Sequence, residues 1–202
     1  MRIVAGSHRG RRLVAPRGHS TRPTADRVKE ALFNILGPPE RREGHHFRVL
    51  DLFAGSGALG LEAVSRGADE VLLVDQDRLA VEAAERNIQA MGVASRARVV
   101  AREAGSVIAG QKAPFDWIFL DPPYEGGALD RALRLLGRGD LVAGVVIAEH
   151  DARNPPDERY GTLVLVDRRR YSDTALSFYR LAPAEAEGAD DASPTTAPEG
   201  QP

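Results

Sequence analysis

The sequence predicts an α/β fold with a doubly wound, mostly parallel sheet. Short apolar runs alternate with amphipathic helical patterns over about a hundred residues, which is the signature of such a sheet. Two apolar runs near the C-terminus follow each other without a helix between them, and these read as an antiparallel hairpin. Composition agrees with a globular protein, because 43% of the 202 residues are hydrophobic and 28% are charged.

The first quarter of the chain predicts a small extension before this sheet. Residues 2–14 read as a β-hairpin, because apolar pairs flank Gly6 and Gly10. Thr24 is the expected N-cap of a helix that ends at Gly37. The predicted organisation is a basic hairpin and helix extension over 1–47, a catalytic domain over 48–182, and a disordered acidic tail over 183–202, which lacks large apolar side chains.

Within the domain, each element follows from a local pattern. Five apolar runs read as buried strands, and the hairpin adds two more, for seven in all: 49–53, 71–74, 97–100, 115–120, 145–148, 162–166 and 175–179. Helical patterns fill the gaps at 59–66, 80–91, 104–111 and 127–136. The arginine run Arg168–Arg170 is expected as a solvated turn of the hairpin. Ligands of such sheets bind beyond the carboxyl ends of the strands, so the functional residues are expected there.

Composition excludes several classes of protein. The chain has no cysteine, which excludes disulfide scaffolds, thiolate zinc sites, iron–sulfur radical enzymes and cysteine nucleophiles. The five histidines lack metal-ligand spacing, so no metal is expected. No apolar run reaches the ~20 residues of a membrane span and the N-terminus has no apolar signal core. A cytoplasmic protein without membrane contact is the expectation.

Charge is distributed unevenly along the chain. Residues 1–30 hold eight basic and two acidic side chains, whereas the last twenty residues hold five acidic and no basic ones. A basic arm on a nearly neutral body favours a polyanionic partner, with a solvated basic face as the alternative. The candidate residues for binding such a partner are Arg9, Arg11, Arg12, Arg22, Arg27 and Lys29.

A glycine motif follows the first strand of the domain. Gly55, Gly57 and Gly60 match G-x-G-x-x-G, and Asp75 ends the next strand. This arrangement favours a nucleoside-containing ligand whose ribose Asp75 would bind. The glycines alone do not separate a dinucleotide from S-adenosylmethionine (SAM). Asp51 favours SAM, because an acid before the turn can meet a methionine ammonium but would repel a pyrophosphate; capping of the loop is the structural alternative.

The segment Asp121-Pro122-Pro123-Tyr124 follows the fourth strand. The two prolines remove two N–H donors, so hydrogen-bond acceptors dominate the surroundings of Asp121. Such a site suits a donor such as an exocyclic amine, and Tyr124 offers a face on which a base can stack. Taken alone, the segment could also be a rigid exit from the strand.

Together these motifs resemble class I SAM-dependent methyltransferases (Rossmann-like fold) that act on amino groups of nucleic-acid bases. Three N-terminal blocks narrow the resemblance to the RsmD family: 2–6, 9–13 and 22–34. The resemblance covers about residues 2–182. It implies methylation of the N2 amine of a guanine in 16S ribosomal RNA (the guanine(966) activity by name), on free RNA or within an assembling small subunit.

The resemblance also assigns roles to residues. Asp51, Gly55 and Gly57 would hold the methionine part of SAM, together with the motif residues Phe53 and Ser56. Asp75 would hold the ribose and Gln76 would lie beside the adenine, with Glu103 and Ala104 at adenine N6 and N1. Residues 121–124 would hold the target guanine.

Three other functions remain open at this point. A DNA adenine-N6 or cytosine-N4 methyltransferase would reuse the proline motif. An NAD-dependent oxidoreductase would use the glycine motif but would leave the proline motif unexplained. A non-catalytic RNA-binding assembly factor would keep both motifs without turnover.

Overall fold

A computed structural model describes residues 1–16, 23–40, 42–124 and 126–183, with the backbone alone for 23–26. Its eight-stranded sheet has the order β3-β2-β1-β4-β5-β8-β7-β6. Strands β1 to β5 pair in parallel and the last three pair antiparallel. The strands are β1 (Arg48–Asp51), β2 (Glu70–Asp75), β3 (Ala97–Ala101), β4 (Phe115–Leu120), β5 (Val142–Asp151), β6 (Arg159–Tyr160), β7 (Leu163–Tyr171) and β8 (Thr174–Leu181). The predicted mostly parallel, doubly wound sheet is confirmed, and the two-residue β6 adds an eighth strand to the seven expected.

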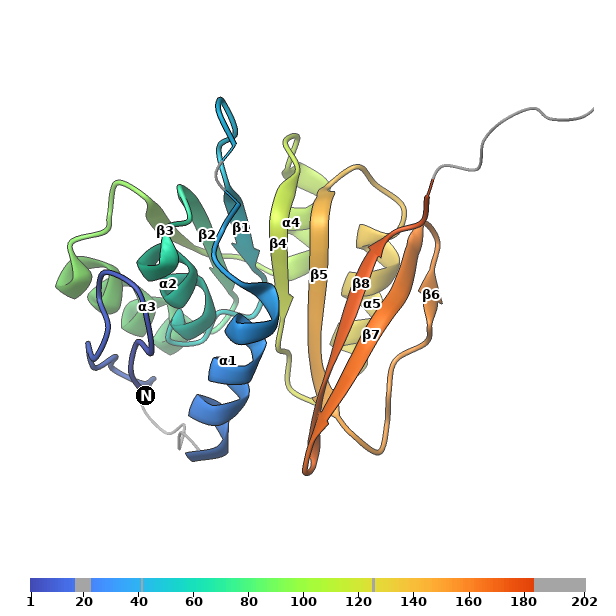
Figure 1. The fold of residues 1–202 in the computed structure, drawn as a ribbon, viewed down its shortest axis with the longest axis horizontal. Coiled ribbons are helices and arrows are strands. Elements are labelled where there is room, and N and C mark those ends of the chain that lie inside the picture. The colour runs from blue at the N-terminus through green and yellow to red at the C-terminus, as the bar shows by residue number, and fades with distance from the viewer. Residues whose placement is uncertain (17–22, 41, 125, 184–202) are drawn as a thin grey trace, which may run out of the picture.

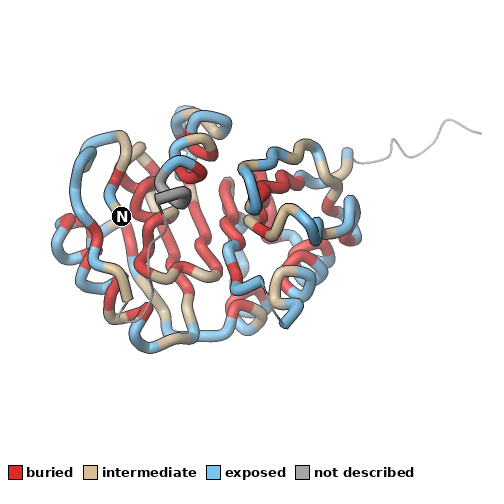
Figure 2. The backbone as a smooth tube through the Cα atoms, turned by 90° about the horizontal axis from the view of Figure 1, so that it is seen from below, coloured by how far each residue is buried: buried red, intermediate tan, exposed pale blue. Residues whose placement is uncertain are grey.

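Helices cover both faces of the sheet (Figure 1). Helices α1 (Pro23–Leu36), α2 (Ala58–Arg66) and α3 (Arg78–Met91) share one buried apolar cluster with one side of the sheet. Helices α4 (Ala104–Gly110) and α5 (Ala128–Leu136) share a second cluster with the other side. Seen from below, the buried strands form a band between helices whose outer surfaces are exposed (Figure 2). Among the described residues, no helix is long and apolar enough to cross a membrane.

Local signals account for the helix ends. The Asp77 side chain accepts a hydrogen bond from Leu79 N at 2.9 Å and so caps the start of α3. Gly92 ends the same helix in the left-handed conformation at φ 67°. Helix α1 begins at Pro23, one residue before the predicted cap at Thr24, because proline suits the first turn of a helix.

The N-terminal segment folds back on itself less regularly than predicted. Residues 1–16 contain one bridge pair, Arg2 with Arg12, and no regular strand. Ile3 N donates to Arg11 O at 2.9 Å and Gly10 N donates to Ile3 O at 2.9 Å. The predicted hairpin is therefore reduced to a bridged loop, which buries Ile3 and Leu13 in the same core as α1.

The β7–β8 hairpin turns later than predicted. Arg168–Arg170 lie within β7, and the turn falls at Ser172, whose φ is 59°. Arg168 donates to Ser177 Oγ at 2.9 Å and to Pro156 O at 2.8 Å. The prediction of a turn at these arginines was wrong, because all three lie within β7. Arg169 and Arg170 are exposed, whereas Arg168 is bonded across the sheet.

Candidate active site

A cavity of about 900 Å³ opens at the carboxyl ends of the parallel strands. This is the edge where doubly wound sheets bind ligands. The cavity brings together nearly all the predicted cofactor and catalytic residues, from four different strand ends: Asp51, Phe53, Gly55, Ser56, Asp75, Gln76, Glu103, Ala104, Asp121, Pro122, Pro123 and Tyr124. Gly57 is the exception, because it is buried behind the wall of the cavity rather than lining it.

Asp51, the last residue of β1, is a buried carboxyl with an unused acceptor. Only 1% of the residue is exposed, and its Oδ2 accepts a hydrogen bond from Gly60 N at 3.1 Å. Its Oδ1 is buried without a hydrogen-bond partner among the described residues. Burial raises the pKa of Asp51 to about 7, and the nearby Asp121 and Asp75 add to the shift. Such an orphaned acceptor fits a ligand cation or N–H donor.

The glycine loop holds this carboxyl in place. Gly57 has a φ of 80° and stands at the N-cap of α2, a conformation that favours glycine. At Gly60 a Cβ atom would lie 2.3 Å from Leu73 Cδ2, so the residue must be glycine for α2 to pack on β2. Gly57 and Gly60 therefore serve the turn and the helix packing, while Gly55 and Ser56 face the cavity.

Asp75 ends β2 on the opposite side of the glycine loop. Its Oδ2 accepts from Gly55 N at 2.8 Å and its Oδ1 accepts from Asp77 N at 2.9 Å. Each carboxylate oxygen keeps a further lone pair, so Asp75 can still accept from two hydroxyl groups. Gln76 and Glu103 are exposed on the same wall of the cavity, and Ala104 is buried at the start of α4.

Asp121 and Glu149 form the acidic floor next to Asp51. The Asp121 side chain is open to the cavity, yet the surrounding protein desolvates it and raises its pKa to about 6. Glu149, on β5, lines the same cavity. Burial, and then the charge of Asp121, raise the pKa of Glu149 to about 8. The sequence analysis missed Glu149, although an acid at the carboxyl end of a buried strand was a usable signal.

Tyr124 links the proline segment to the β7–β8 hairpin. Its ring is 52% exposed and its hydroxyl lies 3.1 Å from Thr174 Oγ1. The hairpin tip, residues 171–174, lines the cavity on this side. Tyr124 therefore lines the cavity beside the hairpin tip, and its hydroxyl is tied to the hairpin.

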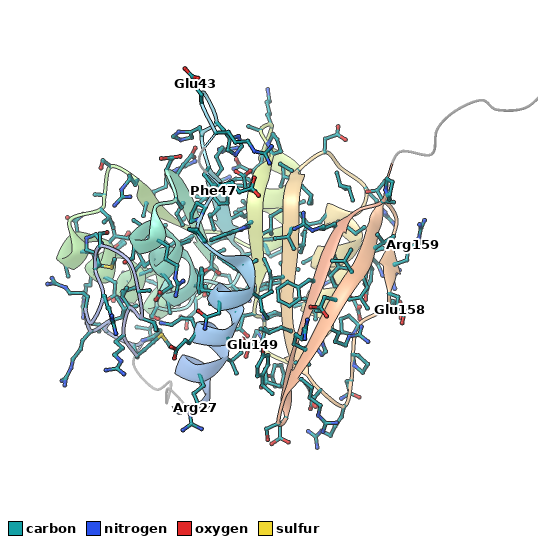
Figure 3. All side chains as sticks on the ribbon, in the orientation of Figure 1. Arg27, Glu43, Phe47, Glu149, Glu158 and Arg159 are labelled. Atoms are coloured by element: carbon teal, nitrogen blue, oxygen red, sulfur yellow. The ribbon has the colours of Figure 1, made fainter. Side chains whose placement is uncertain are left out.

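Part of the basic N-terminal segment points away from this cavity, although Met1, Ala15 and Pro16 of the same segment line it. Arg9 and Arg12 are exposed, and the Arg11 guanidinium donates to Ala90 O near the end of α3. Helix α3 begins beside the cavity and runs for 14 residues, or about 20 Å, to that end. Arg27, at the lower end of α1 in Figure 3, directly precedes Val28, which lines the cavity. Arg22 lies outside the described residues.

Lys29 was wrongly predicted to contact RNA. It is 4% exposed, and its Nζ donates to Arg2 O at 2.5 Å and lies 3.7 Å from Glu62 Oε2. Glu62 is itself fully buried and accepts from Val4 N and Ala5 N at 2.7 and 2.9 Å. Lys29 therefore ties the N-terminal loop to α1 and α2 and is not free to reach a phosphate.

Comparison with known proteins shows to which family the chain belongs. A family model described as "Conserved hypothetical protein 95" matches residues 1–180. The chain is also 36% identical over 194 residues to the Ribosomal RNA small subunit methyltransferase D of Escherichia coli K12, covering 95% of this chain and 94% of that protein. The chain belongs to the RsmD family. The predicted resemblance is confirmed.

A further relative and a solved structure also match the chain. The protein of the same name from Haemophilus influenzae is 38% identical over 139 residues, which cover 67% of this chain and 70% of that protein. A solved structure of a hypothetical protein from Thermus thermophilus superimposes with a TM-score of 0.72 at 32% identity, covering 88% of this chain and 98% of that one. The described residues contain no cluster of His, Asp or Glu side chains suited to a metal ion.

Proposed function

We propose that this RsmD-family chain is a SAM-dependent methyltransferase acting on the exocyclic N2 amine of a guanine in 16S ribosomal RNA. The observation that carries the proposal is the shared cavity. One wall holds Asp51 and Asp75 around a glycine loop, and the adjoining floor holds Asp121 beside an exposed Tyr124. The names of the curated relatives, small-subunit ribosomal RNA methyltransferases, support the RNA substrate.

The cavity fits SAM better than a dinucleotide. The unpaired Asp51 Oδ1 suits the ammonium group of the methionine part, whereas it would repel a pyrophosphate. Asp75 would accept hydrogen bonds from the ribose hydroxyls, and Gln76, Glu103 and Ala104 would border the adenine. When bound, SAM supplies a methyl group on a sulfonium, which an amine nitrogen can accept directly.

The chain's own contribution is orientation and charge. The Asp121 carboxylate would accept a hydrogen bond from the guanine N2 amine and so aim the nitrogen lone pair into the cofactor part of the cavity. It would also stabilise the positive charge that develops on N2 as the new bond forms. The rigid pair Pro122–Pro123 holds this carboxyl at the strand end, and the Tyr124 ring would stack on the base.

The surrounding RNA would meet two sets of arginines. Arg27 precedes Val28, which lines the cavity, whereas Arg11 contacts the far end of α3, about a helix length away. We therefore assign the arm to phosphates remote from the target base, which suits a structured RNA or an assembling small subunit better than a short single strand.

Substitution at Asp121 tests this function. In single-turnover methyl transfer at saturating SAM, Asp121→Ala should slow the reaction by about 10²–10³, the cost of a lost charge-assisted bond that strengthens in the transition state. Asp121→Asn should retain partial activity, because an amide oxygen still accepts a hydrogen bond. SAM affinity, measured by calorimetry, should change little in both. A wild-type rate for Asp121→Ala would overturn the assignment.

A further inference from the structure

Glu149 stands beside Asp121, and the proposed function assigns it no role. Leu120 of β4 pairs with Ala148 of β5, so Asp121 and Glu149 are the next residues along two adjacent strands. The side chains two residues before them, Phe119 and Ile147, belong to the cluster on the α1 face. Because side chains alternate along a strand, both carboxyls belong to that same face, and both line the cavity.

The surroundings of the pair are short of positive charge. Neither carboxyl has an ion-pair partner in the described part of the chain, and the charge acting most strongly on Glu149 is that of Asp121. The cations that line the cavity are Arg102, after β3, and Arg131 of α5, whose Nη1 donates to Gly126 O at 2.6 Å. The remaining ionisable side chains of the lining are acids and tyrosines: Asp51, Asp75, Asp77, Glu103, Tyr124, Tyr171 and Asp173. Helix α1 contributes the uncharged Val28 to the lining.

Two adjacent desolvated carboxyls without a cation cannot both ionise readily, so they share one proton near neutral pH. The higher pKa, about 8, belongs to Glu149, and the lower, about 6, to Asp121. Near neutral pH the floor of the cavity then holds a neutral Glu149 carboxylic acid next to an ionised Asp121 carboxylate. In hydrogen-bonding terms it presents an O–H donor, a C=O acceptor and a carboxylate acceptor.

We propose that Glu149 is the residue that selects guanine, its neutral carboxyl pairing with O6 and N1–H while Asp121 accepts from the N2 amine. This inference rests on the proposed function. Guanine presents an acceptor, a donor and a donor along that edge, the complement of the pair's pattern. Adenine offers an amine and a ring acceptor but no third polar group. Cytosine, with its amine at Asp121, would set its N3 acceptor against the acceptor of Glu149.

A pH profile tests the shared proton. Wild-type single-turnover methyl transfer to unmodified small-subunit ribosomal RNA at saturating SAM should fall below about pH 6, as Asp121 protonates. It should fall again above about pH 8, as Glu149 loses its O–H donor. Glu149→Gln keeps the donor and the acceptor as a neutral amide, so it should retain activity and lose the fall near pH 8. The only remaining fall in its rate on the alkaline side should come from ionisation of guanine N1–H at higher pH.

A base analogue tests the selection itself. In an RNA with 2-aminopurine at the methylated position, the N2 amine remains while O6 and N1–H are absent. Glu149→Leu should slow transfer to guanine by roughly 10–100-fold, the value of two hydrogen bonds, and should lose most of the preference for guanine over 2-aminopurine. Glu149→Gln should keep that preference. Glu158→Gln, which removes an exposed carboxylate outside the cavity, is the matched control and should behave as wild type.

The outcomes distinguish failure of this inference from failure of the proposed function. Urea unfolding and SAM calorimetry confirm that each variant is folded and binds cofactor before its rate is interpreted. If the wild type methylates guanine N2 but Glu149→Gln keeps the fall near pH 8, or Glu149→Leu keeps the preference for guanine, Glu149 does not select the base and the proposed function stands. If the wild type does not methylate guanine N2, the proposed function itself fails.

Discussion

Replacing Asp51 by asparagine should make the protein more stable and worse at binding its cofactor. Asparagine keeps an oxygen that can accept from Gly60 N but removes the charge. Burial raises the pKa of Asp51 from 3.8 to about 7. At 1.36 kcal/mol per pKa unit, that shift corresponds to about 4 kcal/mol of destabilisation once the group is ionised in both the folded and unfolded states.

The stability difference between Asp51→Asn and the wild type should depend on pH. A carboxyl with a raised folded-state pKa stabilises the native state most at low pH, and that contribution disappears as the pH rises. Below about pH 4 the wild type and Asp51→Asn should unfold at similar urea concentrations. As the pH rises to about 7, the variant should become progressively more stable than the wild type. The difference in free energy of unfolding should then level off at roughly 2–4 kcal/mol. Asp173→Asn, at the exposed hairpin tip, is the control and should show no such trend.

The same substitution should weaken SAM binding by about 10–150-fold, because one charge-assisted hydrogen bond to the ammonium group is worth ~1.5–3 kcal/mol. Calorimetry at pH 7 in buffers of different ionisation enthalpy should show proton release on SAM binding to the wild type and less release with Asp51→Asn. Equal stability of the two proteins at pH 8 would refute the reasoning, because Asp51 would then carry no desolvation penalty.

Three further changes address the other parts of the site. Asp75→Ala should lower SAM affinity by about 10–150-fold by calorimetry, and unchanged affinity would mean that the ribose lies elsewhere. Replacing Arg9, Arg11 and Arg12 together by glutamine should reduce the log–log salt slope of RNA binding by about two, with SAM affinity unchanged; an unaltered slope would remove the arm from the RNA interface. Tyr124→Ala should cost ~1–3 kcal/mol of RNA binding in a filter assay whereas Tyr124→Phe should be mild, and equal losses would show that the hydroxyl rather than the ring matters.

Hydrophobic periodicity predicted the sheet because its central strands are buried on both faces. The run before Asp51 and the run before Asp121 could be placed from sequence alone, and so the two motifs were expected at one edge. The β7–β8 turn could not be placed, because Arg168 reads as a turn residue by polarity. Its real position depends on hydrogen bonds to Ser177 and Pro156, which are tertiary contacts.

Tertiary contacts of charged side chains likewise could not be predicted from the sequence. Lys29 looked like part of a basic arm, and only the fold reveals the buried Glu62 that it faces. The position of Glu149 at the end of a buried strand was a usable sequence signal, but only the strand register sets it next to Asp121. Residues in a motif could therefore be predicted, whereas those defined by a neighbour distant in sequence required the structure.

The most direct test is the identity of the methylated nucleoside. Purified protein is incubated with methyl-labelled SAM and unmodified small-subunit ribosomal RNA, free and within small-subunit particles, and the digested RNA is resolved by mass spectrometry. The proposed function predicts label in N2-methylguanosine at one position and its near-complete loss with Asp121→Ala. Label at a ring carbon, at a ribose hydroxyl or at the amine of another base would contradict it, as would the absence of transfer to either substrate.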